Sequence, residues 1–165
     1  MRGGRAREER PLDAAGRQFA IVVSRFNESV TGALLDGARH ALVERGADAT
    51  RIDVYRVPGA WELPGAVARA LGTARYDAIV AIGCVIRGET PHFDYVAGGA
   101  ADGLAELARA ADVPITFGLL TTDTAEQAAA RAGGEHGNKG RDAALAALEM
   151  IDVYRAIDEA SGAGP

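Results

Sequence analysis

The chain has 165 residues, 48% of them hydrophobic, with 18 Lys and Arg against 23 Asp and Glu and a net charge of −5. This composition predicts one globular domain and excludes a disordered or collagen-like chain, and no apolar run reaches the roughly 18 residues of a membrane-spanning helix. A single cysteine, Cys84, excludes an internal disulfide and a CxxC zinc site, so we expect a cytoplasmic protein that contacts no membrane.

The first 17 residues are rich in Arg and Gly and lack both hydrophobic periodicity and the apolar stretch of a signal peptide, so we expect a mobile tail. They contain five Arg and three acidic residues, a charge of +2, and the other 148 residues therefore carry −7. The folded part thus lacks the basic surface that nucleic-acid binding needs, and we expect no nucleic-acid partner. We also expect a flexible C-terminus at 159–165, which leaves residues 18–158 as one folded domain.

Strand-like and helix-like segments alternate through this domain. Short apolar runs predict buried strands at 19–24, 51–57, 77–85 and 113–120. The intervening patterns predict helices from Asn27 or Ser29 to residue 45 and at 62–71, 92–111, 124–132 and 141–157, with a Gly-rich turn at 133–140. Because parallel strands are joined by right-handed helical crossovers, this order predicts an α/β fold: a single three-layer α/β/α domain with a four-stranded parallel, flavodoxin-like sheet. Such sheets bind ligands beyond the carboxyl ends of their strands.

Aromatic side chains follow the first two predicted strands. Phe26 comes directly after the first strand, where it either stacks on a flat ligand or plugs the end of the sheet. After the second strand, a tight Pro-Gly-Ala loop ending at Ala60 exposes backbone amides, and Trp61 and Glu62 begin the next helix. Trp61 is also compatible with a place in the core, and Glu62 stabilises a helix N-terminus whatever the function.

The segment after the third strand, residues 83–92, is the richest in functional groups. Gly88, Thr90 and the unpaired N–H groups of a helix that starts near His92 form a natural anion pocket. The helix dipole there favours a neutral His92 imidazole, which is suited to act as a base. The alternative is an ordinary solvent-exposed histidine at a helix start. Cys84 is predicted to be a small buried strand residue without a catalytic role.

Two cations lie in and beside the Gly-rich segment that follows the fourth strand. Arg131 suits bidentate phosphate binding, whereas Lys139, the only lysine among the 18 basic residues, is a compact point charge. Either Lys139 has a task that arginine cannot perform, or its isolation is chance. Together these groups suit a phosphorylated small molecule and a polar planar ring, and the sequence has no metal-ligand cluster, Walker loop or G-x-G-x-x-G motif.

Four separated motifs resemble those of the 6,7-dimethyl-8-ribityllumazine synthase family, and the likeness runs from about residue 19 to residue 157. The motifs are Arg25-Phe26-Asn27, Val57-Pro58-Gly59-Ala60-Trp61-Glu62-Leu63-Pro64, residues 83–94 and Gly137-Asn138-Lys139-Gly140. The resemblance implies a transferase of riboflavin biosynthesis that condenses 5-amino-6-ribitylaminouracil with 3,4-dihydroxy-2-butanone 4-phosphate. The products are the lumazine, phosphate and water, and neither a metal nor an organic cofactor takes part.

The resemblance also implies roles for individual residues. His92 matches the proton-transfer residue, and Phe26 matches the ring that stacks on the pyrimidine. In family members the neighbouring subunit contributes part of the site. The remaining implied residues are Asn27, Ala60, Trp61 and Glu62 for the pyrimidine and its ribityl chain, Glu89 and Thr90 for the phosphate, and, from the neighbouring subunit, Phe117 and Lys139 for the pyrimidine or ribityl chain and Arg131 as the main phosphate ligand.

Assembly is the last expectation. The predicted helix 92–111 contains Gly98, Gly99 and Gly103, and each of them destabilises the helix by about 1 kcal/mol relative to alanine. Close packing of that helix against another element would explain why glycine is present. The resemblance implies pentamers packed around such helices, and the short segment 133–140 favours the 60-subunit shell that some family members form. Two alternatives stay open: a flavodoxin-like module that binds a flavin or nucleotide without catalysis, and a catalytically silent shell protein.

Overall fold

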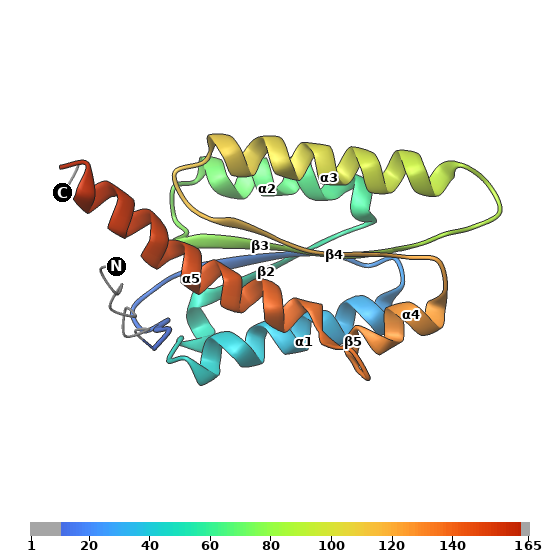
Figure 1. Cartoon of the computed structure of the whole chain (residues 1–165), viewed down its shortest axis with the longest axis horizontal. Coiled ribbons are helices and arrows are strands. Elements are labelled where there is room, and N and C mark those ends of the chain that lie inside the picture. The colour runs from blue at the N-terminus through green and yellow to red at the C-terminus, as the bar shows by residue number, and fades with distance from the viewer. Residues whose placement is uncertain (1–10, 163–165) are drawn as a thin grey trace, which may run out of the picture.

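The computed structural model describes residues 11–162 and has a four-stranded sheet between two layers of helices (Figure 1). Every adjacent pair of strands is parallel, which confirms the predicted three-layer α/β/α domain. The strands lie in the order β2-β1-β3-β4. Their bounds are β1 Phe19–Ser24, β2 Ile52–Val57, β3 Ala78–Ile86 and β4 Ile115–Thr122.

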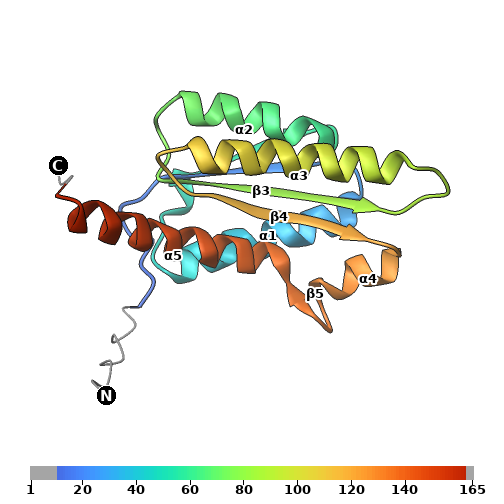
Figure 2. The same ribbon diagram turned by 45° about the horizontal axis from the view of Figure 1, so that its top comes forward.

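Helices cover both faces of the sheet, as Figures 1 and 2 show from two directions. The first layer contains α2 (Leu63–Gly72) and α3 (His92–Ala110), and the second contains α1 (Glu28–Glu44), α4 (Ala125–Ala130) and α5 (Lys139–Ala160). Two short 3-10 helices, η1 (Ala49–Arg51) and η2 (Ala60–Glu62), flank β2. Within the described chain no helix is long and apolar enough to cross a membrane.

The alternation of side chains along β1 divides the core into two halves. Phe19, Ile21 and Val23 belong to the cluster shared with α1 and α5, whereas Ala20 and Val22 belong to the cluster shared with α2 and α3. Successive side chains of a strand point to opposite faces, so a central strand that is buried on both faces must be apolar throughout. This requirement explains why the unbroken apolar run at 19–24 predicts a buried strand.

The Gly-rich segment after β4 differs from the turn that the sequence predicts. It contains an antiparallel hairpin of β5 (Ala132–Gly134) and β6 (Gly137–Asn138), and α5 begins at Lys139 rather than near residue 141. The side chain of Asn138 caps α5 by accepting a hydrogen bond from the N–H of Arg141 at 3.0 Å, which places the helix start two residues earlier. The segment does turn, at residues 135–136 between the two strands, but the predicted start of the last helix near residue 141 was two residues late because capping by Asn138 was not recognised.

The ends of the chain also differ from expectation where they are described. The predicted mobile tail falls largely on residues 1–10, outside the described residues, but Ala14 is fully buried and its N–H donates to the carbonyl of Arg45 at 2.9 Å. At the other end α5 continues to Ala160, past the predicted helix end at residue 157. Packing therefore begins a few residues before residue 18.

Close packing explains two of the three glycines of α3, but the partner is the same chain and not a neighbouring subunit. A Cβ on Gly99 would lie 2.5 Å from Cζ3 of Trp61, and a Cβ on Gly103 would lie 2.8 Å from Cγ of Pro64. The absence of these two side chains lets η2 and α2 approach α3. Gly98 has no atom within 4 Å of its Cβ position, so packing within the chain does not explain it. Of the three glycines, only Gly98 is one that contacts between chains would have to explain.

Replacing Gly140 by alanine is expected to destabilise the fold by about 3 kcal/mol, the upper end of the usual cost of overpacking. A Cβ at this position would lie 2.0 Å from the carbonyl oxygen of Leu34, and backbone cannot move aside as the end of a side chain can. Urea unfolding at fixed protein concentration measures the change. Gly65→Ala is the matched control: Gly65 lies in α2 with no atom within 4 Å of its Cβ position, so alanine there should stabilise by up to about 1 kcal/mol. Equal midpoints for the two variants would contradict this packing.

Candidate active site

The carboxyl ends of all four strands meet at one edge of the sheet, and backbone hydrogen bonds continue the pairing beyond them. The N–H of Arg25 donates to the carbonyl of Val57 at 2.8 Å, and the N–H of Phe26 donates to that of Pro58 at 3.1 Å. On the other side, the N–H of Arg87 donates to the carbonyl of Thr122 at 2.8 Å. These bonds hold the loops after β1 and β2, and after β3 and β4, beside one another.

Phe26 and Trp61 present large aromatic surfaces at this edge. Phe26 is 72% exposed, which rules out the alternative that it plugs the end of the sheet, and Trp61 is 62% exposed, which rules out a place in the core. The ring of Trp61 occupies the space left by the missing side chain of Gly99. Exposed aromatic rings with a fixed backbone suit stacking on a planar ligand.

Glu62 closes the turn on which Trp61 lies. Its Oε2 accepts a hydrogen bond from the N–H of Gly59 at 3.0 Å, across the first turn of η2. Ala60, between them, is buried and packs with the α2 side of the core. Of the three residues predicted to bind the ribityl chain, Trp61 and Glu62 therefore face solvent, whereas Ala60 can offer a ligand only its backbone.

Asn27 links the end of β1 to β3. Its backbone is in the left-handed region with φ of 62°, which asparagine tolerates better than most residues. Its Nδ2 donates to the carbonyl oxygen of Cys84 at 3.0 Å, and its own carbonyl accepts the first N–H groups of α1. Asn27 rather than Ser29 is therefore the residue before α1, and one donor of its amide is already used within the chain.

The loop between β3 and α3 carries the predicted anion pocket. His92 is the first residue of α3, and its N–H makes a long hydrogen bond, 3.4 Å, to Oγ1 of Thr90. Glu89, Thr90 and His92 are all exposed, so their side chains are available to a ligand. The structure therefore brings these three residues to the same edge as Phe26 and Trp61.

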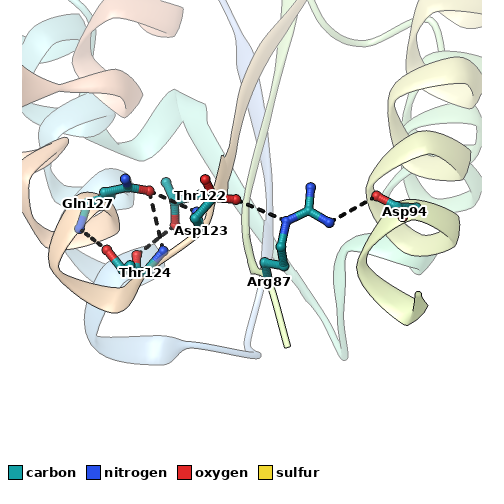
Figure 3. A network of polar contacts seen from close by, with 6 residues as sticks. All are labelled: Arg87, Asp94, Thr122, Asp123, Thr124 and Gln127. Carbon is teal, nitrogen blue, oxygen red and sulfur yellow. Dashed lines mark hydrogen bonds and ion pairs between the residues drawn. The ribbon is translucent and has the colours of Figure 1, made fainter. Parts of the chain in front are cut away.

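Arg87 holds this loop from both sides and was missed at the sequence level (Figure 3). Its Nε donates to Oδ1 of Asp123 at 2.9 Å, just after β4, and its guanidinium lies 3.4 Å from Oδ1 of Asp94 in α3 and 4.3 Å from the centre of the Phe93 ring. The hydrogen bond to Asp123 raises the pKa of Arg87 above its ordinary value. With two carboxylates as partners, Arg87 braces the loop. The signal in the sequence for this contact was the pair of opposite charges, Arg87 and Asp123, just past two neighbouring strands.

Cys84 is a buried residue of β3, as predicted. Burial raises the pKa of its thiol to about 11, so the thiol stays protonated at neutral pH. Since the thiolate is the nucleophilic form of cysteine, Cys84 does not supply a nucleophile.

The structure does not bring every predicted residue to this edge. Phe117 is 52% exposed on the edge strand β4, five residues before Thr122, which places it roughly 16 Å from the strand end. Arg131 donates through a guanidinium nitrogen to the carbonyl of Gln127 at 3.0 Å, and Nζ of Lys139 lies 3.6 Å from Oδ2 of Asp142. Within the described residues, the side-chain contacts of both cations are local, to Gln127 in α4 and to Asp142 in α5, and none joins them to the strand-end loops. We describe them as a second group, the pair of cations at the hairpin.

No group of three or more His, Cys, Asp or Glu side chains is arranged to hold a metal ion among residues 11–162.

Comparison with known proteins identifies the family. The sequence profile described as 6,7-dimethyl-8-ribityllumazine synthase matches residues 16–155. A protein of this name from Gemmatimonas aurantiaca is 65% identical over 139 residues, which cover 84% of this chain and 85% of the relative. Two relatives of the same name are matched over even more of their own length. The protein from Lactiplantibacillus plantarum is 51% identical over 88% of this chain and 92% of the relative, and that from Chlorobaculum tepidum is 48% identical over 90% of this chain and 96% of the relative. The chain belongs to the 6,7-dimethyl-8-ribityllumazine synthase family.

Proposed function

We propose that the protein is the transferase that condenses 5-amino-6-ribitylaminouracil with 3,4-dihydroxy-2-butanone 4-phosphate in riboflavin biosynthesis. The family match along residues 16–155, which include every described strand and most of α5, is the observation that carries this conclusion. The geometry supports it, because exposed aromatic rings and an exposed histidine at a helix start share the edge of the sheet where parallel α/β folds bind ligands.

The reaction requires several proton transfers but no redox step. The amine of the uracil attacks the ketone and forms an imine with loss of water, and elimination then releases phosphate from the neighbouring carbon chain. Loss of phosphate leaves the carbon that carried the hydroxyl group as an enol, which tautomerises to a new ketone. The ribitylamino nitrogen closes the second ring on this ketone, and a second water molecule leaves. We assign the proton transfers to His92, since positioned acid–base catalysis contributes roughly 10²–10⁴-fold. Holding the two reactants together in one pocket supplies much of the remaining acceleration.

We assign the substrates to the two groups of residues at hand. Phe26 stacks on the pyrimidine, and Asn27 together with residues 60–62 binds the uracil and its ribityl chain. Glu89 and Thr90, through the backbone and hydroxyl of their loop, bind the phosphate. Arg131, Lys139 and Phe117 complete the site from a neighbouring copy of the chain, which is consistent with their separation from His92 within one chain. The site is therefore complete only in an oligomer.

We propose pentamers as the basic assembly and a 60-subunit shell as the complete particle. Four large aromatic side chains are exposed on the single chain: Phe26, Trp61, Phe117 and Tyr95. Proteins rarely expose several such side chains to water, which supports their burial between chains. Light scattering measures the particle directly. A mass of sixty chains of 17.1 kDa each is expected, and a mass of only five such chains would refute the shell.

The direct test of the reaction mixes the protein with both substrates and follows the absorbance of the lumazine against the uncatalysed rate. A clear acceleration is expected. An unchanged rate, with a flavin co-purifying tightly, would favour the non-catalytic binding module instead. An unchanged rate with intact particles and no bound flavin would favour a silent shell protein.

Lys139→Arg is expected to lower kcat/KM about tenfold although the charge is kept. Arginine presents a broad planar fork where lysine presents a compact ammonium, so the substitution crowds the pocket. The reverse exchange Arg69→Lys, on an exposed position of α2, is the control and should leave the kinetics unchanged. If Lys139→Arg has wild-type kinetics, the site does not require lysine at position 139, and the presence of a single lysine in the sequence is due to chance.

A further inference from the structure

The β5–β6 hairpin is flanked by both cations that the proposed function places in the site of a neighbouring chain, Arg131 and Lys139. The N–H of Lys139 donates to the carbonyl of Arg131 at 2.9 Å, and inside this bond Ala132 pairs with Asn138. The backbones of Arg131 and Lys139 are thus neighbours across the hairpin. Whatever fixes the hairpin against the helices fixes both cations at once.

The hairpin has few interactions of its own to fix it. It has two strands of three and two residues, and an isolated two-stranded hairpin is marginally stable at best. Gly133 and Gly137 have positive φ angles of 100° and 77°, and the strands are largely exposed. Its position must therefore come from contacts with the helices beside it.

On the α4 side, the N–H of His136 in the hairpin turn donates to the carbonyl of Ala130 at 2.7 Å. The carboxamide of Asn138 makes the contacts with the other two helices. Its Oδ1 accepts from the N–H of Arg141 at 3.0 Å and so begins α5. Its Nδ2 donates to the carbonyl oxygen of Ala33 in α1 at 3.0 Å, a partly buried bond between residues 105 positions apart in the chain. One side chain thus ties the hairpin to α5 and to α1.

The surface of α1 is shaped to receive this side chain. A Cβ on Gly37, one helical turn after Ala33, would lie 2.4 Å from Cγ, Nδ2 and Oδ1 of Asn138 alike. A Cβ on Gly140 would lie 2.0 Å from the carbonyl oxygen of Leu34. Glycine at both positions lets the start of α5 approach α1 closely enough for the carboxamide to enter the notch at Gly37.

Only one half of this arrangement needs asparagine. Serine, threonine and aspartate cap helices about as well, because capping requires only an acceptor. The bond to Ala33 requires a donor on the same short side chain, which aspartate lacks at neutral pH. The structure uses one of only two asparagines in the chain where both functions are needed.

We infer that Asn138 is a positioning residue for the reaction: its carboxamide, seated in the notch at Gly37, sets the place of Arg131 and Lys139 relative to α1. This inference rests on the proposed roles of those two cations in the site, above all that of Arg131 at the phosphate. The loss of the Asn138 donor lets the hairpin shift while the cap of α5 and the fold remain. A shift of the cations weakens phosphate binding, so KM for the butanone phosphate rises.

The test compares Asn138→Asp, which keeps the cap and loses the donor, with Asn138→Ala, which loses both, in the assembled protein. Steady-state kinetics should show KM for the butanone phosphate raised about tenfold in each, the effect of losing one well-placed hydrogen bond. Thermal unfolding and particle size are measured in parallel. Asp48→Asn, which alters a cap at η1 near the amino ends of the strands, is the control and should leave both KM values unchanged.

A merely structural role predicts a different pattern. Partial unfolding would reduce the number of active sites and lower the apparent kcat, but it would leave KM as it is. The double variant Asn138→Asp, Arg131→Ala separates the two further, since a residue that acts through Arg131 adds little once Arg131 is gone.

Two outcomes would overturn the inference, and they are distinguishable. If Arg131→Ala raises KM for the butanone phosphate and Asn138→Asp does not, Asn138 does not position the cations. If Arg131→Ala itself leaves this KM unchanged, the phosphate role of Arg131 fails, and the inference fails with it.

Discussion

Replacing His92 by alanine is expected to lower kcat by roughly 10²–10⁴-fold, the usual contribution of a positioned general acid or base. His92 is exposed at the first position of α3, beside the loop of Glu89 and Thr90, and its side chain makes no hydrogen bond or ion pair with the rest of the described chain. Its loss should therefore remove proton transfer without disturbing the fold. Steady-state kinetics measures the change, with unfolding and particle size as checks.

His40→Ala is the matched control for this variant. His40 is also exposed, but it lies in α1 with Nε2 2.9 Å from Oε1 of Glu44, on the outer surface. Its replacement should leave kcat unchanged. If His92→Ala turned over as fast as wild type, the assignment of proton transfer to His92 would be wrong.

Replacing Arg131 by alanine is expected to raise KM for 3,4-dihydroxy-2-butanone 4-phosphate about 100-fold, because charge-assisted bidentate hydrogen bonds to phosphate are among the strongest in proteins. KM for the uracil substrate, which carries no phosphate, should stay near the wild-type value. Arg69→Ala removes an exposed arginine from α2 and serves as the control. Equal increases in the two KM values would contradict a role confined to the phosphate.

Mixing the His92→Ala and Arg131→Ala variants, at a butanone phosphate concentration far below the raised KM of Arg131→Ala, tests whether neighbouring chains share the site. In randomly co-assembled rings, about a quarter of the sites would receive His92 from one chain and Arg131 from the next, since the contacts repeat head to tail. Activity should therefore return to about that fraction after disassembly and reassembly. Failure to recover any activity, with co-assembly demonstrated, would mean that both residues serve the same site within one chain.

The central sheet is well predicted by the sequence because burial on both faces leaves a strong signal. Residues 19–24 and 77–85 are almost uninterrupted apolar runs, and the structure places β1 and β3 at the centre of the sheet. The motifs at the strand ends were also located correctly, since in a parallel sheet all carboxyl ends share one edge. Local patterns suffice where each element is buried by its neighbours.

Local sequence patterns could not predict contacts between side chains that lie far apart in the sequence. The placement of Trp61 over Gly99 and that of Asn138 in the notch at Gly37 depend on how two elements pack, not on the periodicity of either. The brace formed by Arg87 likewise joins residues from three separate loops and helices. A glycine in a helix signals that something approaches closely, but the sequence does not say which segment approaches.

The most direct test of the proposed reaction measures lumazine and inorganic phosphate together in one reaction of the wild-type protein with both substrates. One phosphate released per lumazine formed, at a rate well above the uncatalysed reaction and lost in His92→Ala, is the predicted result. Phosphate release without lumazine, or lumazine formation no faster than in the absence of protein, would contradict the assignment.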